Sequence, residues 1–366
     1  MPKAIIVGGG IAGLASGIAF SNAGWDVEVL ERAARFEPLG AALSLWPNAC
    51  AAMSSIGVLN EVSAAGAPIT AMQLATRDGR TILRRSIPDQ AMMSTRASLQ
   101  SALLRAIGSE RVRLDCHVEH ISNDRVELAG GETMACDLVV DAGGVRALSG
   151  SGSKPDYAGY GGVLALSGEA DGTELSGLAA EYWGRDERFG VFELPENRRY
   201  WFYMRSQSAE TSMPNLAMCR VAAEGWPEPI AQAIAATRED ALIPFAVHAK
   251  PTPKALNVHG ILLVGDAAHA MEPNLGQGAC QGLEDAAALQ AIVSTVTLAK
   301  VAIEYERVRL RRARMFVRES ARARFGAHGP RALQTIFRAA LRVLPPAVTE
   351  RRMQAMHTMP DYLASV

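Results

Sequence analysis

The 366-residue sequence predicts an α/β protein in which a parallel sheet is interrupted by a second, mostly antiparallel sheet. Three observations support this fold class. An Ile/Val-rich run at the N-terminus leads directly into a glycine turn and an apolar helix, and the same order of strand, glycine and helix returns near residue 260. Between them lie strand-like runs rich in aromatic residues. Short apolar runs of the first kind are typical of parallel strands that are buried on both faces.

The first strand is expected at residues 4–7, and the helix that follows it at residues 11–23. Between them, Gly8, Gly10 and Gly13 fit the pattern G-x-G-x-x-G. In that pattern the first glycine makes a tight turn, the second lets a pyrophosphate approach the backbone, and the third lets the helix pack closely on the strand. The N-H groups at the helix start and its dipole would then face the pyrophosphate.

Residues 26–30 predict the second parallel strand, and Glu31 stands at its end. Glu31 follows Gly13 by 31 − 13 = 18 residues, close to the interval at which an acidic residue binds a ribose. The stretch therefore predicts a dinucleotide site. The alternative, a signal-peptide core at residues 4–20, is disfavoured by the consecutive glycines and by the position of Glu31.

Composition predicts an ordinary globular protein, with 49% hydrophobic residues, 20% charged residues and a net charge of −1. We therefore expect no nucleic-acid or membrane partner, and either a monomer or a homodimer. The five cysteines lack C-x-x-C spacing, so we expect neither a metal site nor a disulfide framework, and a cytoplasmic location.

After Glu31, the sequence predicts a glycine-containing loop beginning at Pro38, a brief extended run, and a helix at residues 49–56 with Asn48 as N-cap. Residues 72–76 and 81–83 flank Asp78-Gly79 and predict a hairpin belonging to a different sheet. An amphipathic helix is expected at residues 98–107, just after Arg96, which spacing alone would place on the solvated surface.

Short strands are expected at residues 111–114, 118–121 and 126–128, and a buried strand at 137–141 that returns to the first sheet. A small-residue linker at 149–155 then introduces the aromatic region, with strands at 163–167, 189–194 and 200–204. Most of these rings must form a plain hydrophobic core. A face of such a sheet lying over a cofactor could also hold a planar substrate.

The run 256–266 returns to the parallel-strand pattern and ends in Asp266, where α/β sheets bind ligands. Gly276 and Gly278 precede a helix at residues 279–296, whose start would face a second part of the same ligand. His269 is interpreted as a packed, hydrogen-bonded histidine rather than a general base. The arginine-rich helices at 301–325 and 331–344 are interpreted as a solvated face that docks the domains, in preference to a nucleic-acid or lipid surface.

Together, the N-terminal fingerprint with Glu31, Arg96, Gly265-Asp266 and the run from Pro273 to Gly278 resemble the single-component, class A FAD-dependent aromatic hydroxylases typified by p-hydroxybenzoate hydroxylase. The run 40–48 is similar to the urate hydroxylase, salicylate hydroxylase and zeaxanthin epoxidase branches. The resemblance implies a discontinuous Rossmann-like FAD-binding domain (1–70, 93–150 and 256–330), an inserted antiparallel substrate domain (71–92 and 151–255) and a C-terminal helical segment (331–366).

The same resemblance implies the cofactor contacts along the chain. It places the nucleotide end of FAD at the first turn and its reactive ring at the second. The implied set is Gly8, Gly10, Ile11, Ala12, Gly13, Glu31, Arg32, Ala42, Arg96, Val118, Asp266, Leu275, Gly276, Gln277, Gly278 and Ala279. For the substrate pocket we expect one wall from the turn of Pro273, Asn274 and Leu275 and another from Arg188, Phe192, Trp201 and Tyr203. Arg188 could attract an anionic substrate there, and a role as a surface arginine is the open alternative.

Two positions depart from the family pattern. The family usually carries Ala-Asp-Gly where this chain has Ala142-Gly143-Gly144, so a carboxylate thought to serve FAD and NAD(P)H is missing unless Asp141 substitutes. The residue after Pro273 is Asn274, where the urate hydroxylase branch can carry an acid. Asparagine is not a base at neutral pH, so no deprotonation role is assigned to it.

The implied activity is an FAD-dependent monooxygenase. NAD(P)H, bound transiently, would reduce FAD, and O2 would form a flavin C4a-hydroperoxide that hydroxylates or epoxidises a small aromatic or unsaturated substrate. The alternatives are an FAD-dependent oxidase or reductase without hydroxylation, motivated by Gly143, and a non-catalytic FAD-binding sensor. A flavin-dependent halogenase is disfavoured because its Trp-x-Trp-x-Ile-Pro signature is absent.

Overall fold

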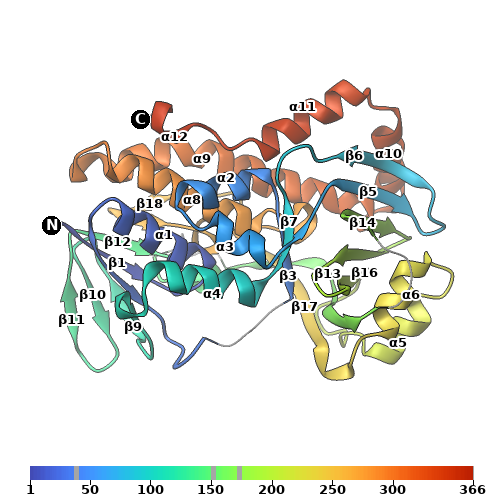
Figure 1. Ribbon diagram of the computed structural model, residues 1–366, viewed down its shortest axis with the longest axis horizontal. Coiled ribbons are helices and arrows are strands. Elements are labelled where there is room, and N and C mark those ends of the chain that lie inside the picture. The colour runs from blue at the N-terminus through green and yellow to red at the C-terminus, as the bar shows by residue number, and fades with distance from the viewer. Residues whose placement is uncertain (37–40, 150–153, 171–174, 366) are drawn as a thin grey trace.

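The computed structural model describes residues 1–36, 41–149, 154–170 and 175–365 (Figure 1). Residues 38–40 of the predicted loop and residues 150–153 of the predicted linker lie outside this part of the chain. Elsewhere the predicted α/β class is confirmed, with one mostly parallel sheet, one mostly antiparallel sheet and two small sheets.

The first sheet has six strands in the order β18-β19-β12-β1-β2-β8. Its strands are parallel except for β18, which runs antiparallel to β19. The bounds are β1 Lys3–Val7, β2 Asp26–Leu30, β8 Val112–Arg113, β12 Leu138–Asp141, β18 Asn257–Val258 and β19 Ile261–Leu263. The predicted return of the run at 137–141 to this sheet is therefore correct, because β12 pairs directly with β1.

Side chains alternate between the two faces of β1 and enter two different cores. Ala4 and Ile6 belong to the main core under the helices, whereas Ile5 and Val7 pack against a small sheet on the other face. The helices are α1 (Ile11–Asn22), α4 (Arg96–Ile107) and α8 (Gly278–Val293). The small sheet consists of β9 (Val118–Ile121), β10 (Arg125–Leu128) and β11 (Thr133–Ala135).

The second large sheet has seven strands in the order β17-β13-β16-β15-β14-β5-β6. All neighbours are antiparallel except β14 and β5. The predicted hairpin, β5 (Ala71–Thr76) and β6 (Thr81–Ser86), forms one edge of it, as expected from its separate pattern. The other strands are β13 Asp156–Glu169, β14 Leu178–Trp183, β15 Glu187–Glu193, β16 Arg198–Ser206 and β17 Leu242–Ala249.

Two helices that the sequence analysis did not identify cover one face of this sheet. They are α5 (Leu216–Ala222) and α6 (Glu228–Ala235), at the lower right of Figure 1. Leu216, Cys219 and Ile230 from these helices form a core with strand residues. The opposite face of the sheet is therefore the one turned toward the first sheet and its helices, where Phe192 and Tyr200 pack against the main core.

The second small sheet, β3-β7-β4, lies beside the start of helix α2. Its strands are β3 Ala42–Leu45, β4 Ala67–Pro68 and β7 Met92–Thr95, and the adjoining helices are α2 Pro47–Ser55 and α3 Leu59–Ala64. The prediction that Asn48 caps α2 is wrong. Trp46 is the N-cap, Pro47 occupies the first turn, and Asn48 is fully buried inside the helix.

The C-terminal part consists of helices that lie across the top of Figure 1. They are α9 (Leu298–Ala323), α10 (Arg331–Val343), α11 (Pro346–His357) and α12 (Tyr362–Ser365). Helix α9 packs on α8, and α12 also returns to α8. Within the described ranges, none of the helices combines the length and apolar character needed to cross a bilayer.

Candidate active site

The first glycine turn connects β1 to α1, and two of its glycines are required because a side chain would not fit at their positions. Gly8 has a φ of +110°, and a Cβ there would lie 2.5 Å from the carbonyl oxygen of Ala142. A Cβ on Gly13 would collide with the carbonyl oxygen of Gly8, because helix and strand approach closely there. A Cβ on Gly10 would meet no atom within 4 Å, so this glycine leaves the backbone open to a ligand.

Glu31 is tied to the same turn by hydrogen bonds to backbone groups. Its carboxylate accepts from the N-H groups of Gly9 at 2.7 Å and Ala33 at 2.9 Å. Neighbouring Arg32 is exposed. The acidic residue predicted from its interval therefore lies beside the glycines, although its contact with a ribose remains a prediction.

Helix α4 begins next to this turn. Thr95 is its N-cap and accepts from the N-H of Ser98 at 3.1 Å, so the helix starts at Arg96, earlier than predicted. Gln100, one turn after Arg96, donates weakly to the carbonyl of Gly9 at 3.5 Å. Because residues four apart share a helix face, exposed Arg96 lies on the side of α4 that faces the glycine turn.

Ala42 and Val118 occupy different environments near the first turn. Ala42 is paired with Thr95 in the small sheet, next to Arg96. Val118 is buried in the core between the parallel sheet and the β9-β10-β11 sheet, together with Leu30. Ala42 therefore lies beside the start of α4, and Val118 lies beside the end of β2.

The strand β19 delivers Asp266 to the same end of the parallel sheet. Gly265 has a φ of +57°, and a Cβ there would lie 2.6 Å from Cβ of Ala12 in the first turn of α1. Gly282 approaches the same alanine, with its Cβ position 2.9 Å from Cβ of Ala12. Asp266 is exposed at the start of the short helix α7 (Asp266–His269). Two segments about 250 residues apart in sequence therefore meet at the carboxyl ends of β1 and β19.

The second glycine turn comprises Pro273–Leu275, a 3-10 turn, and Gly276 with a φ of +61°. A Cβ on Gly276 would collide with Oγ of Ser44 and would lie 3.0 Å from Nε1 of Trp46. Gln277 is buried and its side chain points away from the turn, donating to Oδ1 of Asn48 at 3.3 Å. Any ligand contact of Gln277 must therefore come from its backbone.

The residues around these two turns fit a long dinucleotide such as FAD. Within the described residues, α1 and α8 have neither a side-chain cap nor an acidic residue in the first turn, so both helix starts can receive negative charge. Like Gly10, Gly278 leaves open space at the Cβ position. Nε1 of Trp46 is buried beside the second turn and has no hydrogen-bond partner in the described residues.

Arg188 and Asn274, which the sequence predicts in two walls of a substrate pocket, are brought together by the structure. Nη2 of Arg188 donates to Oδ1 of Asn274 at 2.6 Å, and Nη1 donates to Glu181 at 2.6 Å. The guanidinium also lies over the rings of Tyr160 and Phe202, at 5.8 and 5.3 Å from their centroids. Arg188 is 4% exposed, so the open alternative of a surface arginine is excluded.

Asn274 has every hydrogen-bonding atom engaged. Its Nδ2 donates to Glu272 at 3.0 Å and to the carbonyl of Ser320 at 2.8 Å, and its Oδ1 is within 2.9 Å of the Tyr160 hydroxyl. That hydroxyl also lies 2.9 Å from Glu272, and its single proton serves one acceptor at a time. Burial raises the pKa of the Glu272 carboxyl. Asn274 thus anchors the turn, whereas Pro273 is exposed.

The predicted wall containing Trp201 and Tyr203 is wrong for these two residues. They lie opposite Val191 and Phe189 in the sheet and belong to the core under α5 and α6, where Nε1 of Trp201 donates to Thr237. Directly paired residues share a face. Tyr200 and Phe202, one position away on β16, lie on the face that also carries Phe192 and Arg188.

Asp141 cannot substitute for the carboxylate missing at Gly143, because its own carboxylate is not accessible. It is fully buried, and its two oxygens accept from the N-H groups of Gly143 at 2.9 Å and Ser149 at 2.7 Å. A Cβ on Gly143 would lie 3.0 Å from Oδ1 of Asp141. The carboxylate therefore stabilises the turn after β12.

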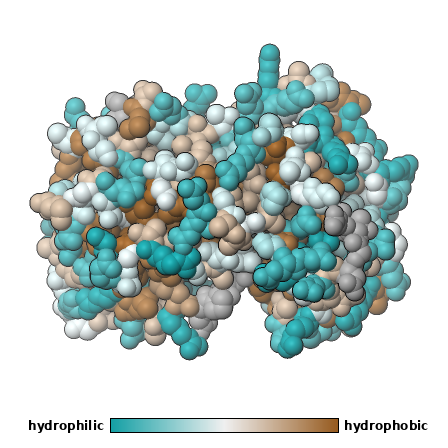
Figure 2. Space-filling view, in the orientation of Figure 1, coloured by the Kyte–Doolittle hydropathy of each residue, from teal (hydrophilic) through white to brown (hydrophobic). Residues whose placement is uncertain are grey.

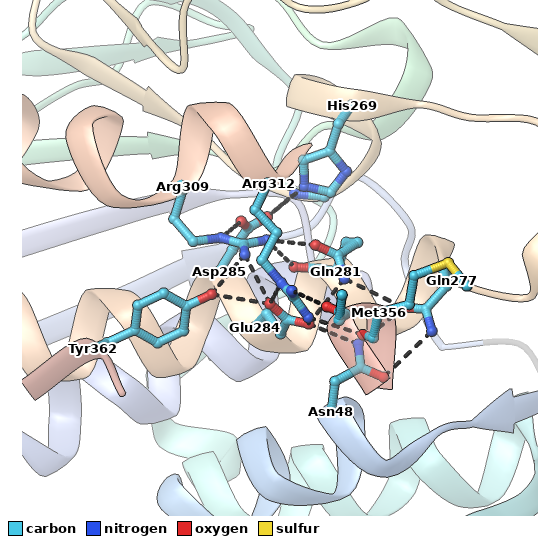
Figure 3. A network of polar contacts seen from close by, with 12 residues as sticks. Asn48, His269, Gln277, Gln281, Glu284, Asp285, Arg309, Arg312, Met356 and Tyr362 are labelled. Carbon is cyan, nitrogen blue, oxygen red and sulfur yellow. Dashed lines mark hydrogen bonds and ion pairs between the residues drawn. The ribbon is translucent and has the colours of Figure 1, made fainter. Parts of the chain in front are cut away.

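A buried polar network behind the second turn was missed by the sequence analysis (Figure 3). Arg309 is fully buried and donates to Glu284 at 2.9 Å and to Asp285 at 2.8 Å, so its assignment to a solvated face is wrong. Arg312 also binds Glu284, at 2.5 Å. The network joins α8, α9, α2 and α12 through Asn48, Gln277, Gln281, Glu284, Asp285, Arg309, Arg312 and Tyr362.

The charges in this network stabilise one another. Burial raises the pKa of the Asp285 carboxyl, but His269 and Arg309 outweigh it and hold that pKa at about 2. Nε2 of His269 lies 2.7 Å from Asp285, and the ring is fully buried, which confirms the interpretation of a packed histidine. Helix α8, which starts at the second glycine turn, is therefore fixed by ionic contacts along its buried side.

Comparison with known proteins agrees with this geometry. The family model described as an FAD binding domain matches residues 2–320. The aurachin C monooxygenase/isomerase of Stigmatella aurantiaca is 32% identical over 342 residues, covering 87% of this chain and 88% of that relative. The 2-heptyl-3-hydroxy-4(1H)-quinolone synthase of Pseudomonas aeruginosa is 30% identical, with coverages of 86% and 87%. The FAD-dependent urate hydroxylase of Klebsiella pneumoniae is 27% identical, with coverages of 89% and 91%.

Among solved structures, HpxO of Klebsiella pneumoniae in complex with FAD and uric acid superimposes with a TM-score of 0.86 at 25% identity, covering 100% of this chain and 97% of that one. A salicylate hydroxylase substrate complex, at 19% identity and a TM-score of 0.79, shares the fold and covers 100% of this chain and 97% of that one. The match over most of the chain and the two glycine turns lead to one conclusion: the chain belongs to the class A FAD-dependent aromatic hydroxylases, which are flavoprotein monooxygenases.

Proposed function

We propose that this protein uses NAD(P)H and O2 to hydroxylate or epoxidise a small aromatic or unsaturated substrate that carries no net negative charge. The observation that carries the proposal is the position of Arg188, whose charge is already balanced by Glu181 on the face that also presents Phe202. Family membership indicates the reaction class, and this ion pair restricts the expected substrates to molecules without a net negative charge.

The residues of the two turns would hold FAD as follows. Gly8, Gly10 and Gly13 with Glu31 would hold the nucleotide end, Arg96 would approach the pyrophosphate, and Asp266 would accept from the ribitol hydroxyls. The start of α8 would lie at the pyrimidine edge of the ring, where partial positive charge stabilises an anion by roughly 0.3 to 1 kcal/mol. Bound in this way, FAD would supply the redox chemistry, namely hydride acceptance from NAD(P)H and transfer of one oxygen atom of O2 to the substrate.

The aromatic face of the seven-stranded sheet would position the substrate and exclude water. Phe192, Tyr200 and Phe202 form ring contacts with centroid separations of 5.5 to 6.3 Å. Burial raises the pKa of the Tyr200 hydroxyl, which keeps it protonated and able to donate to a substrate oxygen. A planar ring would contact these side chains, and water would be excluded from the reacting atoms.

The charge balance at Arg188 favours a neutral ring over an aromatic anion. Arg188 already binds a carboxylate and an amide oxygen, each at 2.6 Å, and its buried Nε has no partner within the described residues. A substrate carboxylate could reach that Nε, but it would meet a guanidinium whose charge Glu181 already balances and would bring a second carboxylate into a buried site. The Pseudomonas relative is named for a quinolone, a neutral ring system, and the Klebsiella relative for urate. The charge balance at Arg188 supports a neutral ring, such as a quinolone, as the substrate.

The test is to mix the purified FAD-bound protein with NADPH or NADH, then with neutral phenols and quinolones and with aromatic carboxylates. Hydroxylated product and H2O2 are both measured. Oxygenated product from neutral rings supports the proposal. Substrate-stimulated NAD(P)H oxidation that yields only H2O2 would identify an oxidase or reductase, which the glycine at 143 motivates. Failure of NAD(P)H to reduce the flavin would identify a sensor.

A matched pair of variants tests the substrate charge separately from the reaction. Glu181→Gln leaves Arg188 without its carboxylate, so binding of an aromatic carboxylate, followed by the change it causes in flavin absorbance, should tighten about tenfold. Glu187→Gln removes a carboxylate that accepts from Tyr203 on the opposite face of the same sheet, and should leave that affinity unchanged. Equal effects of the two substitutions would refute the role of the Glu181–Arg188 pair.

A further inference from the structure

The outer surface of α10 presents apolar side chains to solvent along its whole length. Leu333, Ile336 and Val343 are 42%, 63% and 79% exposed, and Ala340 between them is also exposed. Their spacing of three and four residues places them on one side of the helix. We call this set, together with the corner formed by Pro346, Ala347 and Val348 at the start of α11, the α10 surface. Figure 2 shows hydrophobic side chains reaching the surface at the upper right, where Figure 1 places α10 and α11.

The inner side of α10, next to the apolar stripe around the helix, is firmly attached to the protein. Phe337 and Leu341 pack against Ile82 and Trp183 of the seven-stranded sheet. Arg338 donates to the carbonyl of Gly326 at 2.7 Å and also to that of Gly184. Packing of the inner side therefore fixes the orientation of the helix, so the apolar outer residues stay exposed to solvent.

The α10 surface lies in a strongly basic part of the chain. Residues 320–349 contain no aspartate or glutamate, whereas they contain five arginines, at 322, 324, 331, 338 and 342. Arg322 and Arg324 are ion-paired with Glu319 and Glu272, and Arg338 donates to backbone carbonyls. Arg331 and Arg342 are exposed on α10 itself. The whole chain has a net charge of −1, so this positive charge is a local feature.

We infer that the α10 surface docks the protein onto an anionic lipid bilayer. By helical spacing, Arg331 and Arg342 lie on the polar side of α10, away from the apolar residues. An amphipathic helix with apolar residues on one side and arginines on the polar side is the arrangement that lies in the interface of a membrane, with its apolar side among the acyl chains. Its arginines then meet the negative headgroups. The mode is peripheral, since no described helix can span a bilayer. The inference departs from the expectation of a solvated helix face drawn from sequence alone.

Charge separates a bilayer from the other candidate occupants. A second copy packed symmetrically through the apolar side of α10 would cover the apolar residues, but it would give Arg331 and Arg342, on the other side of the helix, no acidic partner from residues 320–349. Nucleic acid would complement the arginines but would leave Ile336 and Val343 in water. A bilayer with acidic headgroups complements both.

The experiment is vesicle flotation of the full-length, FAD-loaded protein. Vesicles of phosphatidylcholine alone are compared with vesicles of equal parts phosphatidylcholine and phosphatidylglycerol. We expect flotation only with the second kind, decreasing as salt is raised. Recovery of the protein in the unbound fraction with both kinds of vesicle would overturn the inference.

Two sets of variants test which residues are responsible. Ile336→Asp with Val343→Asp should reduce the bound fraction at least tenfold, because charge replaces apolar area. The matched control is Met218→Asp with Val221→Asp, which changes two exposed apolar residues at the same kind of spacing on α5 and should float like the wild type. Equal loss in both pairs would refute a specific α10 surface.

Should the α10 pair impair folding, seen by flavin content and circular dichroism, Arg331→Gln with Arg342→Gln provides an independent test. Each substitution should weaken binding to anionic vesicles about fivefold. Sedimentation without lipid completes the test. A dimer that Ile336→Asp converts to a monomer would assign the α10 surface to a second copy and overturn the lipid assignment.

Discussion

Asn274 accepts a hydrogen bond from Arg188 at 2.6 Å, and this contact ties the turn at Pro273–Leu275 to the aromatic face of the seven-stranded sheet. Asn274 also donates to Glu272 and to the carbonyl of Ser320. The turn is therefore held between β15 and α9 by one amide group. Only a side chain with both a donor and an acceptor can make this set of contacts.

Asn274→Asp should destabilise the protein by about 1 to 3 kcal/mol, because two donated hydrogen bonds are lost. The new carboxylate would face Glu272, and protonation of either group would relieve their repulsion. The cost should therefore be larger at pH 8 than at pH 6, measured by urea unfolding. Asn215→Asp is the control, since Asn215 caps α5 and aspartate caps equally well. A cost that is the same at both pH values would contradict the proximity of the two carboxylates.

Asp266→Ala should weaken FAD retention roughly tenfold to a hundredfold, as expected for loss of a charged hydrogen-bond acceptor. Flavin content after gel filtration measures the effect. Asp26→Ala changes an exposed aspartate at the opposite, amino end of the same parallel sheet and should retain FAD fully. Unchanged occupancy in the Asp266 variant would remove this residue from the cofactor site.

Arg309→Met should cost about 3 to 5 kcal/mol of unfolding free energy, because Glu284 and Asp285 would lose a buried cation. Arg311→Met, two positions along α9 at an exposed site, should change stability by less than about 0.5 kcal/mol. Both are measured by denaturant unfolding. A similar small effect for the two variants would show that the network of Figure 3 contributes little to stability.

His328 predicts a loss of stability in mild acid. Burial, with the nearby charges of Arg188 and Arg324, lowers its pKa from 6.5 to about 2. Below pH 6.5 the unfolded chain therefore binds a proton that the folded protein does not, so stability falls as pH decreases, by at most about 1.4 kcal/mol per pH unit for this group.

The measurement is urea unfolding between pH 7 and pH 5, and comparison of wild type with variant separates the histidine from the carboxylates that begin to titrate at the acid end of this window. His328→Gln should flatten the slope, whereas His120→Gln, at an exposed position on β9, should leave it as in the wild type. His357, whose burial lowers its pKa to about 4, adds a slope of the same sign. An unchanged slope in the His328 variant would show that this ring is accessible to protons in the folded protein.

The parallel sheet could be predicted because its information is local. The run before Gly8 and the run before Gly265 each combine strand, turn and helix within a short stretch, and the structure shows the steric reasons for both glycines. The hairpin around Gly79 could also be predicted, because an Asp-Gly turn and alternating side chains determine it.

The faces of the aromatic strands could not be assigned in the same way. A period of two separates Trp201 and Tyr203 from Tyr200 and Phe202, but it does not say which set meets the cofactor side. That depends on α5 and α6, which cover the first set and whose weak local patterns were not recognised. The strand was therefore predicted correctly, and only the face of the sheet that meets the cofactor side was assigned wrongly.

Arg309 illustrates a second limit. In sequence it stands among other arginines on a helix, and only its position opposite Glu284 and Asp285 makes it a buried residue. Those partners lie 25 and 24 residues earlier, on another helix. Spacing along one helix carries no information about such a pairing.

The hydroxyl of Tyr362 lies 2.9 Å from Glu284, a residue that precedes it by 78 positions. At elongation rates of about 5–20 residues per second, the ribosome reaches this tyrosine roughly 4 to 16 s after it has added the glutamate. Throughout that interval the nascent chain holds carboxylates destined for the interior without all of their partners. The buried network around Glu284 is thus completed only after synthesis has passed Tyr362, so α8 cannot gain its full set of ionic and hydrogen-bonded contacts as it leaves the ribosome.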